Sequence, residues 1–147
     1  MRIVVDANII FSSILNSNGK IGDLLIKSGD FFSFIAPDFL RTEIYNHHDR
    51  LMKMSNLRLE QILESEHQIY KFITFISEEQ ISKESWNLAD SLVSDIDHKD
   101  TIYIAYAEEF MCKLWTGDKK LIIGLSKKNY HNVLTTDDLL AIRTGKN

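Results

Sequence analysis

The sequence has one cysteine, one proline and six glycines in 147 residues, and it has no long apolar run. A lone Cys112 cannot form an intramolecular disulfide, which favours a reducing compartment. No apolar stretch approaches the ~18 residues that span a bilayer, and the first residues lack the basic and apolar regions of a secretion signal. These absences predict a cytoplasmic protein without membrane contact, flexible linkers or repeats.

An excess of positive charge is also missing. The 17 Lys and Arg residues against 21 Asp and Glu give a net charge of −4, so we do not expect the overall field to hold nucleic acid. Nucleic acid binding stays open, because a local acidic site can supply most of that charge. The length predicts a single domain over residues 1–147, and the hydrophobic content of 44% is ordinary for a globular protein.

Strand and helix patterns alternate along the chain. Short apolar runs predict strands at residues 2–5, 31–36, 72–76, 114–115 and 133–134. Amphipathic or alanine-rich segments predict helices at 21–27, 38–54, 57–70, 77–93, 97–111, 119–125 and 137–142. Asp38 and Ser77 are the expected N-caps of two of them. Such alternation predicts an α/β domain whose parallel sheet is covered by helices on both faces.

Four acidic residues stand where a carboxylate is costly or calls for an explanation. Asp6 and Asp118 directly follow apolar runs, whereas Glu43 and Asp100 lie on predicted helices along or beside the apolar stripe. Ligands of open α/β sheets bind beyond the carboxyl ends of the strands. Carboxylates ~4 Å apart repel by ~4 kcal/mol at an effective dielectric constant of 20, so converging acids would need a cation. Oxygen ligands favour Mg²⁺ or Mn²⁺ over zinc.

Each acid also has a purely structural explanation. Asp6 and Asp118 could be turn or N-cap residues, and Glu43 could be an ordinary solvated helical residue. Asp100 lies in a first helical turn, where the helix dipole stabilises a carboxylate. For Asp97, three residues earlier, a capping role is the better interpretation. The spacing of these residues leaves both interpretations open.

Other polar residues accompany the acids. Asn8 could orient the carboxylate that follows the first strand, and Thr116 offers a hydroxyl on the same turn as Asp118. Lys119 and Lys120 open a basic helix beside that aspartate. Such a helix is either a solvated face or a binding surface for a phosphate backbone.

Together these residues resemble the PIN-domain family of metal-dependent ribonucleases. The family pattern has an Asp and a nearby Asn or Ser after the first strand, and a Glu on a later helix. An Asp that starts an alanine-rich helix and a Thr-x-Asp before another helix complete it. The matching residues are Asp6, Asn8, Glu43, Asp100, Thr116 and Asp118. The resemblance spans nearly the whole chain through the order and spacing of these residues.

The resemblance implies a three-layer α/β/α sandwich with a central, mainly parallel five-stranded sheet and the acids at one end. It implies that Mg²⁺ or Mn²⁺ is held by the catalytic residues Asp6, Glu43, Asp100 and Asp118, with Asn8, Thr116 and Asp97 around them. The expected reaction is cleavage of RNA. Small single-domain members are often VapC-type toxins held inactive by a cognate antitoxin, and they often form homodimers.

Three alternatives compete with this hypothesis. A receiver-like phosphoacceptor domain would need a second acid beside Asp6, where the chain has Ala7. A catalytically silent PIN-like module would bind RNA or a protein without turnover. A nuclease of the same kind could instead act on DNA or a small phosphoester. Metal-dependent cleavage of RNA separates the silent module from the enzyme.

Overall fold

Five parallel strands form one sheet in the computed structural model, which describes residues 1–145. The strands are β1 (Arg2–Val5), β2 (Ser33–Pro37), β3 (Ile73–Ile76), β4 (Lys113–Trp115) and β5 (Val133–Leu134). Their order is β3-β2-β1-β4-β5, and each neighbouring pair is parallel. Receiver domains have the order 2-1-3-4-5, so the receiver alternative does not fit this sheet. The predicted single domain ends on residues 146–147, which lie outside the described residues.

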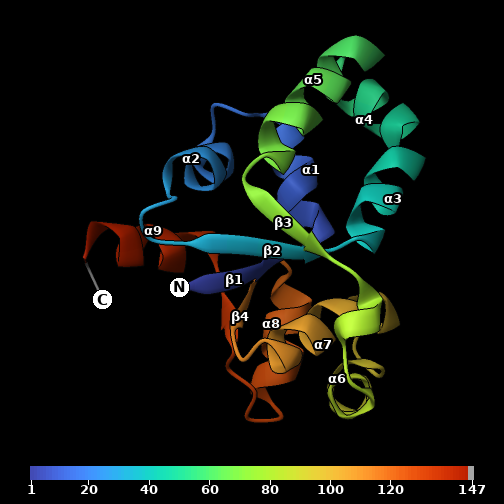
Figure 1. The fold of residues 1–147 in the computed structure, drawn as a ribbon, viewed down its shortest axis with the longest axis vertical. Helices are drawn as coiled ribbons and strands as arrows, with labels where there is room; N and C mark the ends of the chain where they lie inside the picture. Colours follow the sequence, from blue (N-terminus) through green and yellow to red (C-terminus); the bar gives the residue numbers. More distant parts are fainter. Residues whose placement is uncertain (146–147) are drawn as a thin grey trace.

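Helices cover both faces of the sheet (Figure 1). The α-helices are α1 (Ala7–Leu15), α2 (Lys20–Lys27), α3 (Phe39–Asn46), α4 (His48–Ser55), α5 (Leu59–Tyr70), α6 (Lys83–Val93), α7 (Thr101–Glu109), α8 (Lys119–Ser126) and α9 (Thr136–Thr144). Two 3₁₀ turns, η1 (Glu78–Gln80) and η2 (His98–Asp100), flank α6. Helices α1 to α5 lie on one side and α6 to α8 on the other, which confirms the predicted α/β/α sandwich.

The core lies on both faces of β1. Ile3, Val4 and Val5 are fully buried, as expected for a central parallel strand that reads as a continuous apolar run. Trp115 of β4 is buried too, and its ring centroid lies 5.6 Å from that of Phe34 in β2. The ends of these central strands are therefore held firmly, which fixes the turns that follow them.

The helix predicted over 38–54 is two helices. The chain leaves helical geometry at His47 (φ −113°, ψ 17°), between α3 and α4. Asp38 does not cap α3, because its own backbone is helical, and its carboxylate accepts a 2.7 Å hydrogen bond from Arg41 instead. Helix α1, for which the sequence pattern gave no prediction, begins directly after Asp6. Within residues 1–145, no helix is both long and apolar enough to cross a bilayer.

The helices predicted over 77–93 and 97–111 are shorter than expected. Ser77 caps η1, whereas α6 starts after Ser82, whose hydroxyl accepts a hydrogen bond from the Ser85 N–H. Helix α7 ends at Glu109, and the chain then turns through Met111 with a φ of 50°. Ser77 and Ser82 thus set where η1 and α6 begin, and the turn at Met111 leads from α7 into β4.

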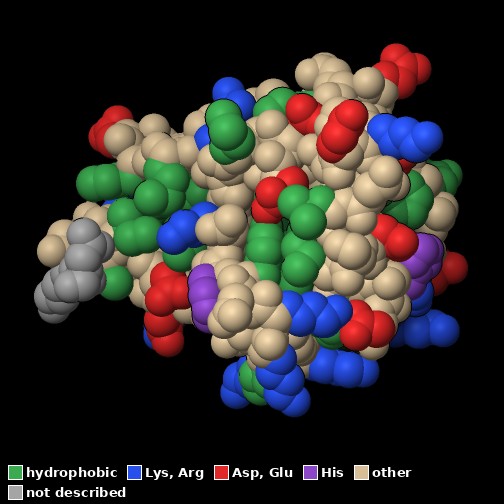
Figure 2. All heavy atoms as spheres, turned by 90° about the horizontal axis from the view of Figure 1, so that it is seen from below, with side chains coloured by type: hydrophobic (Ala, Val, Ile, Leu, Met, Phe, Trp, Pro, Cys, Tyr) green, Lys and Arg blue, Asp and Glu red, His purple; other side chains and the backbone are tan. Residues whose placement is uncertain are grey.

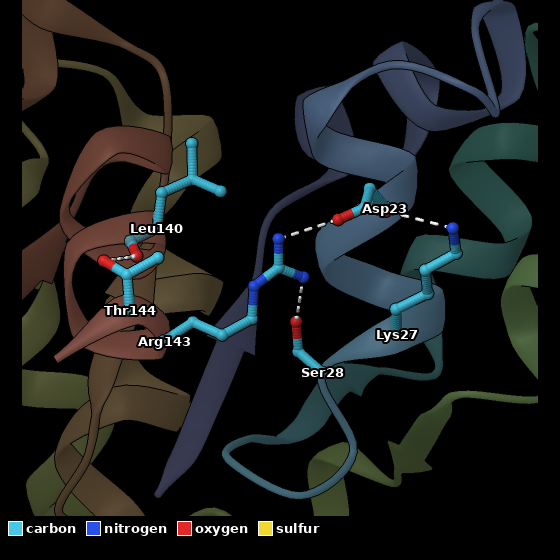
Figure 3. A network of polar contacts seen from close by, with 6 residues as sticks. All are labelled: Asp23, Lys27, Ser28, Leu140, Arg143 and Thr144. Carbon is cyan, nitrogen blue, oxygen red and sulfur yellow. Dashed lines mark hydrogen bonds and ion pairs between the residues drawn. The ribbon is translucent and has the colours of Figure 1, made fainter.

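Polar contacts fix the outer helices. Arg143 of α9 donates a 2.7 Å hydrogen bond to Asp23 of α2 and a 3.0 Å bond to Ser28 (Figure 3). The guanidinium holds the pKa of the Asp23 carboxyl below its usual value. A second contact joins two neighbouring helices, because His48 of α4 pairs with Glu66 of α5. Both contacts join segments that are distant in the sequence.

Candidate metal centre

An acidic cleft of about 170 Å³ opens at the carboxyl edge of the sheet. Its acidic residues are Asp6, Glu43, Asp97, Asp100 and Asp118. β1 and β4 are neighbours in the sheet, so the turns that follow them bring two of these aspartates together. Helix α3 supplies Glu43, and the η2 turn, which leads into α7, contains Asp100 and is capped by Asp97. The structure thus brings the four predicted acids and the fifth, Asp97, to one place.

Asp6 is the most buried of these acids, with 3% of its surface exposed. Its Oδ1 accepts a 3.0 Å hydrogen bond from the Ile9 N–H, so it caps α1. The Thr116 side chain also hydrogen-bonds to it. Burial outweighs these bonds and raises the pKa of Asp6 to about 6, with a further contribution from the nearby charge of Asp118.

Asp118 begins α8 on the neighbouring turn. Its Oδ1 accepts a 3.2 Å hydrogen bond from the Leu121 N–H, which confirms the capping interpretation. The Thr116 hydroxyl accepts a 3.1 Å hydrogen bond from the Asp118 N–H. The fully buried Thr116 also lowers the pKa of Asp6, so its side chain lies close to both turns.

Asp100 is affected by the charges of all four other acids of the cleft. Burial first, and then the charges of Asp97, Asp6, Asp118 and Glu43 in that order, together raise its pKa to about 7. Its Oδ2 is buried and has no hydrogen-bond partner among the described residues. A buried carboxylate oxygen without a donor is costly, and a bound cation or proton would offset that cost.

Asp97 has two roles in the geometry. Its Oδ1 accepts a 3.0 Å hydrogen bond from the Lys99 N–H and caps η2, as the sequence indicated. It also offers a carboxylate oxygen that lies within 4.8 Å of oxygens from Asp100 and Asp118. A trio of carboxylate oxygens at this spacing fits the donor preference of a divalent cation.

Glu43 lies on the opposite wall of the cleft, on α3. The Tyr103 hydroxyl, itself on α7 and 3% exposed, donates a 3.3 Å hydrogen bond to Glu43 Oε2. The phenol therefore holds the carboxylate from across the cleft. The sequence reasoning missed Tyr103, although its position three residues after Asp100 places both on one helix face.

The remaining lining of the cleft differs from the sequence expectation. His47, Arg50 and Lys99 line the cleft, and sequence reasoning assigned none of them to the site. The sequence could have indicated them, because His47 and Arg50 follow Glu43 by four and seven residues and Lys99 directly precedes Asp100. Lys119 and Lys120 are exposed in the first turn of α8 and are not among the residues that line the cleft.

Asn8 lines the cleft and is exposed to solvent. Its backbone N–H, rather than its amide side chain, hydrogen-bonds to Asp6 and lowers that carboxyl's pKa slightly. The face formed by α6, α7 and α8 carries basic and acidic side chains together, with Lys and Arg gathered along one margin (Figure 2). This face therefore carries charges of both signs.

Comparisons with known proteins agree with this geometry. The family model described as "PIN domain" matches residues 4–138. A chain from the crystal structure of VapBC2 from Rickettsia felis, bound to a DNA fragment from their promoter, is 12% identical with a TM-score of 0.65; the match covers 92% of this chain and 98% of that one. PAE2754 from Pyrobaculum aerophilum is also 12% identical, with a TM-score of 0.67 and coverage of 99% and 90%.

No curated protein matches the chain significantly. At 12% identity the two structural matches establish the fold alone. The family model, however, covers most of the chain, from β1 to the first turn of α9, and includes all five acids of the cleft. The chain therefore belongs to the PIN domain family.

Proposed function

We propose that this protein is a divalent-metal-dependent ribonuclease that hydrolyses RNA phosphodiester bonds at the acidic cleft. The supporting observation is the meeting of carboxylates from separate segments around a buried, unpartnered Asp100 oxygen. PIN domains are typically metal-dependent nucleases, which agrees with the proposal. Asp6, Glu43, Asp100 and Asp118 would hold Mg²⁺ or Mn²⁺.

The donor set fits such an ion. Carboxylate oxygens of Asp100, Asp118 and the neighbouring Asp97 lie within 4.8 Å of one another, so Asp97 stands beside two of the four proposed ligands. Two unit charges at that distance repel by about 3.5 kcal/mol at an effective dielectric constant of 20. The raised pKa values of Asp6 and Asp100 express the same repulsion together with burial. A divalent cation would relieve it without proton uptake, and carboxylate oxygens are the ligands that Mg²⁺ and Mn²⁺ prefer.

The chain's own residues have distinct tasks in this mechanism. When bound, the metal would lower the pKa of a coordinated water and offset negative charge on the phosphate oxygens. Thr116 fixes the Asp6 and Asp118 turns, and the Tyr103 hydroxyl orients Glu43. Such contacts keep ligand carboxylates in one orientation.

Cations at the rim of the cleft would position the substrate. Lys99 and Arg50 line it from opposite helical segments, η2 and α4. A phosphate backbone that approaches the acids needs such positive charge, because the protein's net charge is −4. These residues, rather than Lys119 and Lys120, are our candidates for phosphate contacts at the cleft.

Asp6→Asn tests the proposal. Single-stranded RNA is incubated with the purified protein and Mg²⁺ or Mn²⁺, with EDTA as the metal-free control. We expect cleavage by the wild-type protein only with metal, and a loss of at least about 100-fold in the variant. Asp30→Asn, at an exposed position outside the cleft, should cleave like the wild type. Full activity of the Asp6 variant, or cleavage that persists in EDTA, would contradict the mechanism.

A finer proposal is that the protein is the toxin of a toxin–antitoxin pair. Its support is the shared fold with a chain of VapBC2, which was crystallised with promoter DNA. Induced expression should then arrest growth, and co-expression of the cognate antitoxin should relieve the arrest. Normal growth while the protein cleaves RNA in vitro would favour a housekeeping RNA-processing role instead.

A further inference from the structure

A second pocket, of about 590 Å³, opens beside the acidic cleft. Residues of α3, η1, α6, η2 and the start of α7 line it, and Glu43 and Lys99 belong to both the pocket and the cleft. Its volume lies in the range of small-molecule sites. A ligand held at the carboxylates is therefore adjacent to this pocket.

The walls of the pocket carry aromatic rings. Phe39, in the first turn of α3, keeps 43% of its surface exposed, and Trp86 of α6 is partly exposed. Ile102 of α7 adds an aliphatic surface. Large apolar side chains lining a pocket beside a polar site suit a flat, partly apolar ligand. Nucleobases stack on such rings without regard to sequence.

A buried hydroxyl in the lining is left without a partner. Thr101 is 7% exposed, and its Oγ1 makes no hydrogen bond within the described part of the chain. Buried polar groups nearly always have a partner, and an unsatisfied one destabilises the protein. Rotation of the Thr101 side chain about χ1 would turn Oγ1 towards the pocket, where the polar edge of a ligand could satisfy it. The hydroxyl is therefore an available hydrogen-bond partner for a ligand in this pocket.

The charges around the pocket select the part of a nucleotide that can enter. Glu78 and Asp90 contribute carboxylates, which repel a phosphate, whereas Lys99 lies where the pocket meets the cleft. A phosphate would thus stay on the cleft side and the uncharged base would enter. Carboxylates accept hydrogen bonds but donate none, so they favour bases with an exocyclic amino group over uracil.

We propose that this pocket binds one unpaired nucleobase of the RNA substrate, next to the bond that is cleaved. The base would stack on Phe39 and Trp86, meet the Thr101 hydroxyl, and present an amino group to the carboxylates. The placement beside the scissile bond rests on the proposed ribonuclease function. Binding of the base itself does not require a metal or turnover.

Nuclear magnetic resonance provides a direct test, because the sequence contains only two tryptophans. The indole N–H signal of Trp86 reports on the pocket, and that of the fully buried Trp115 is the internal control. The metal-free wild-type protein is titrated with adenosine, cytidine, uridine and ribose. We expect adenosine and cytidine to shift the Trp86 signal saturably, uridine to bind at least about threefold more weakly, and ribose to have no effect.

Two variants test the contacts. Thr101→Val keeps the shape of the side chain and should weaken adenosine binding about fivefold while the melting temperature stays the same or rises. Phe39→Ala should weaken it about tenfold. Leu88→Ala changes an exposed apolar residue on α6 that is not in the lining, and it should bind like the wild type.

No shift of the Trp86 signal with any nucleoside would overturn the proposal. Wild-type affinity in both Thr101→Val and Phe39→Ala would overturn it as well. Equal binding of uridine and cytidine would refute the selection for amino groups. Because nucleosides are not cleaved, the titration stands apart from the Asp6→Asn cleavage assay, and either proposal can fail without the other.

Discussion

Asp6→Asn should stabilise the metal-free protein at neutral pH. Asp6 is 3% exposed, and burial raises its pKa from 3.8 to about 6. An acid with a raised pKa binds its proton more tightly in the folded state than in the unfolded state. The free energy of unfolding therefore increases as the pH falls from above 6 towards 3.8 and is lowest when the carboxylate is charged. At about 1.36 kcal/mol per pKa unit, the charged form costs about 3 kcal/mol.

The amide removes that cost and keeps the local structure. Asn caps helices about as well as Asp, so the hydrogen bond from the Ile9 N–H to the residue 6 side chain can persist. We expect a gain of up to about 3 kcal/mol at pH 7.5 and convergence with the wild type below pH 4. Urea unfolding in EDTA between pH 4 and pH 8 measures both. The variant should lose part of the wild-type pH dependence.

Saturating Mg²⁺ or Mn²⁺ should reverse the order of stability. A ligand at 1,000 times its Kd adds about 4.1 kcal/mol to the wild type, which exceeds the variant's gain of about 3 kcal/mol, and the variant has lost one of its proposed ligands. Asp30→Asn, outside the cleft, is the control for a general effect of removing one negative charge. A metal-free Asp6→Asn protein that is less stable than the wild type at pH 7.5 would refute the reasoning. Capping and the Thr116 bond would then outweigh the cost of the buried charge.

Two further predictions concern single contacts. Tyr103→Phe removes the donor to Glu43, so we expect metal-dependent RNA cleavage to fall about fivefold with the fold intact by circular dichroism; unchanged cleavage would contradict the orienting role. In Gly22→Ala, the added Cβ would lie 2.2 Å from a backbone oxygen of the preceding loop, which should lower the free energy of unfolding by about 1–3 kcal/mol in urea titrations. Gly29→Ala meets no atom within 4 Å and should change it by less than about 0.5 kcal/mol.

Local patterns predicted most of the fold. The apolar run at residues 2–5 predicted a buried strand, which β1 confirms, and the confirmed parallel α/β/α arrangement follows from the alternation of strands and helices. The errors lie where tertiary contacts decide the geometry. One amphipathic stripe runs through α3 and α4, so periodicity could not reveal the break at His47. Helix α1 buries one face, but the partly exposed Phe11 and Leu15 on its other face are apolar too, so the sequence shows no clear amphipathic stripe.

The acids were visible in the sequence because each stood after a strand or on an apolar stripe without a local cation. Their identity as oxygen ligands, and hence the type of cation expected, depends on residue chemistry alone. The family resemblance added the expectation that they meet. Asp97 shows the limit of such reasoning, since its capping bond was foreseen but its place among the converging oxygens was not.

The sequence by itself determined the strands, the order of the elements and the acidic residues, because hydrophobic period and side-chain chemistry are local properties. Only the tertiary structure decided which side chains face each other across the cleft. Tyr103 bonding to Glu43, Thr116 joining two turns, and Lys99 standing between cleft and pocket all depend on contacts between elements. Such contacts are set by packing of helices on the sheet, to which residues distant in the sequence contribute jointly.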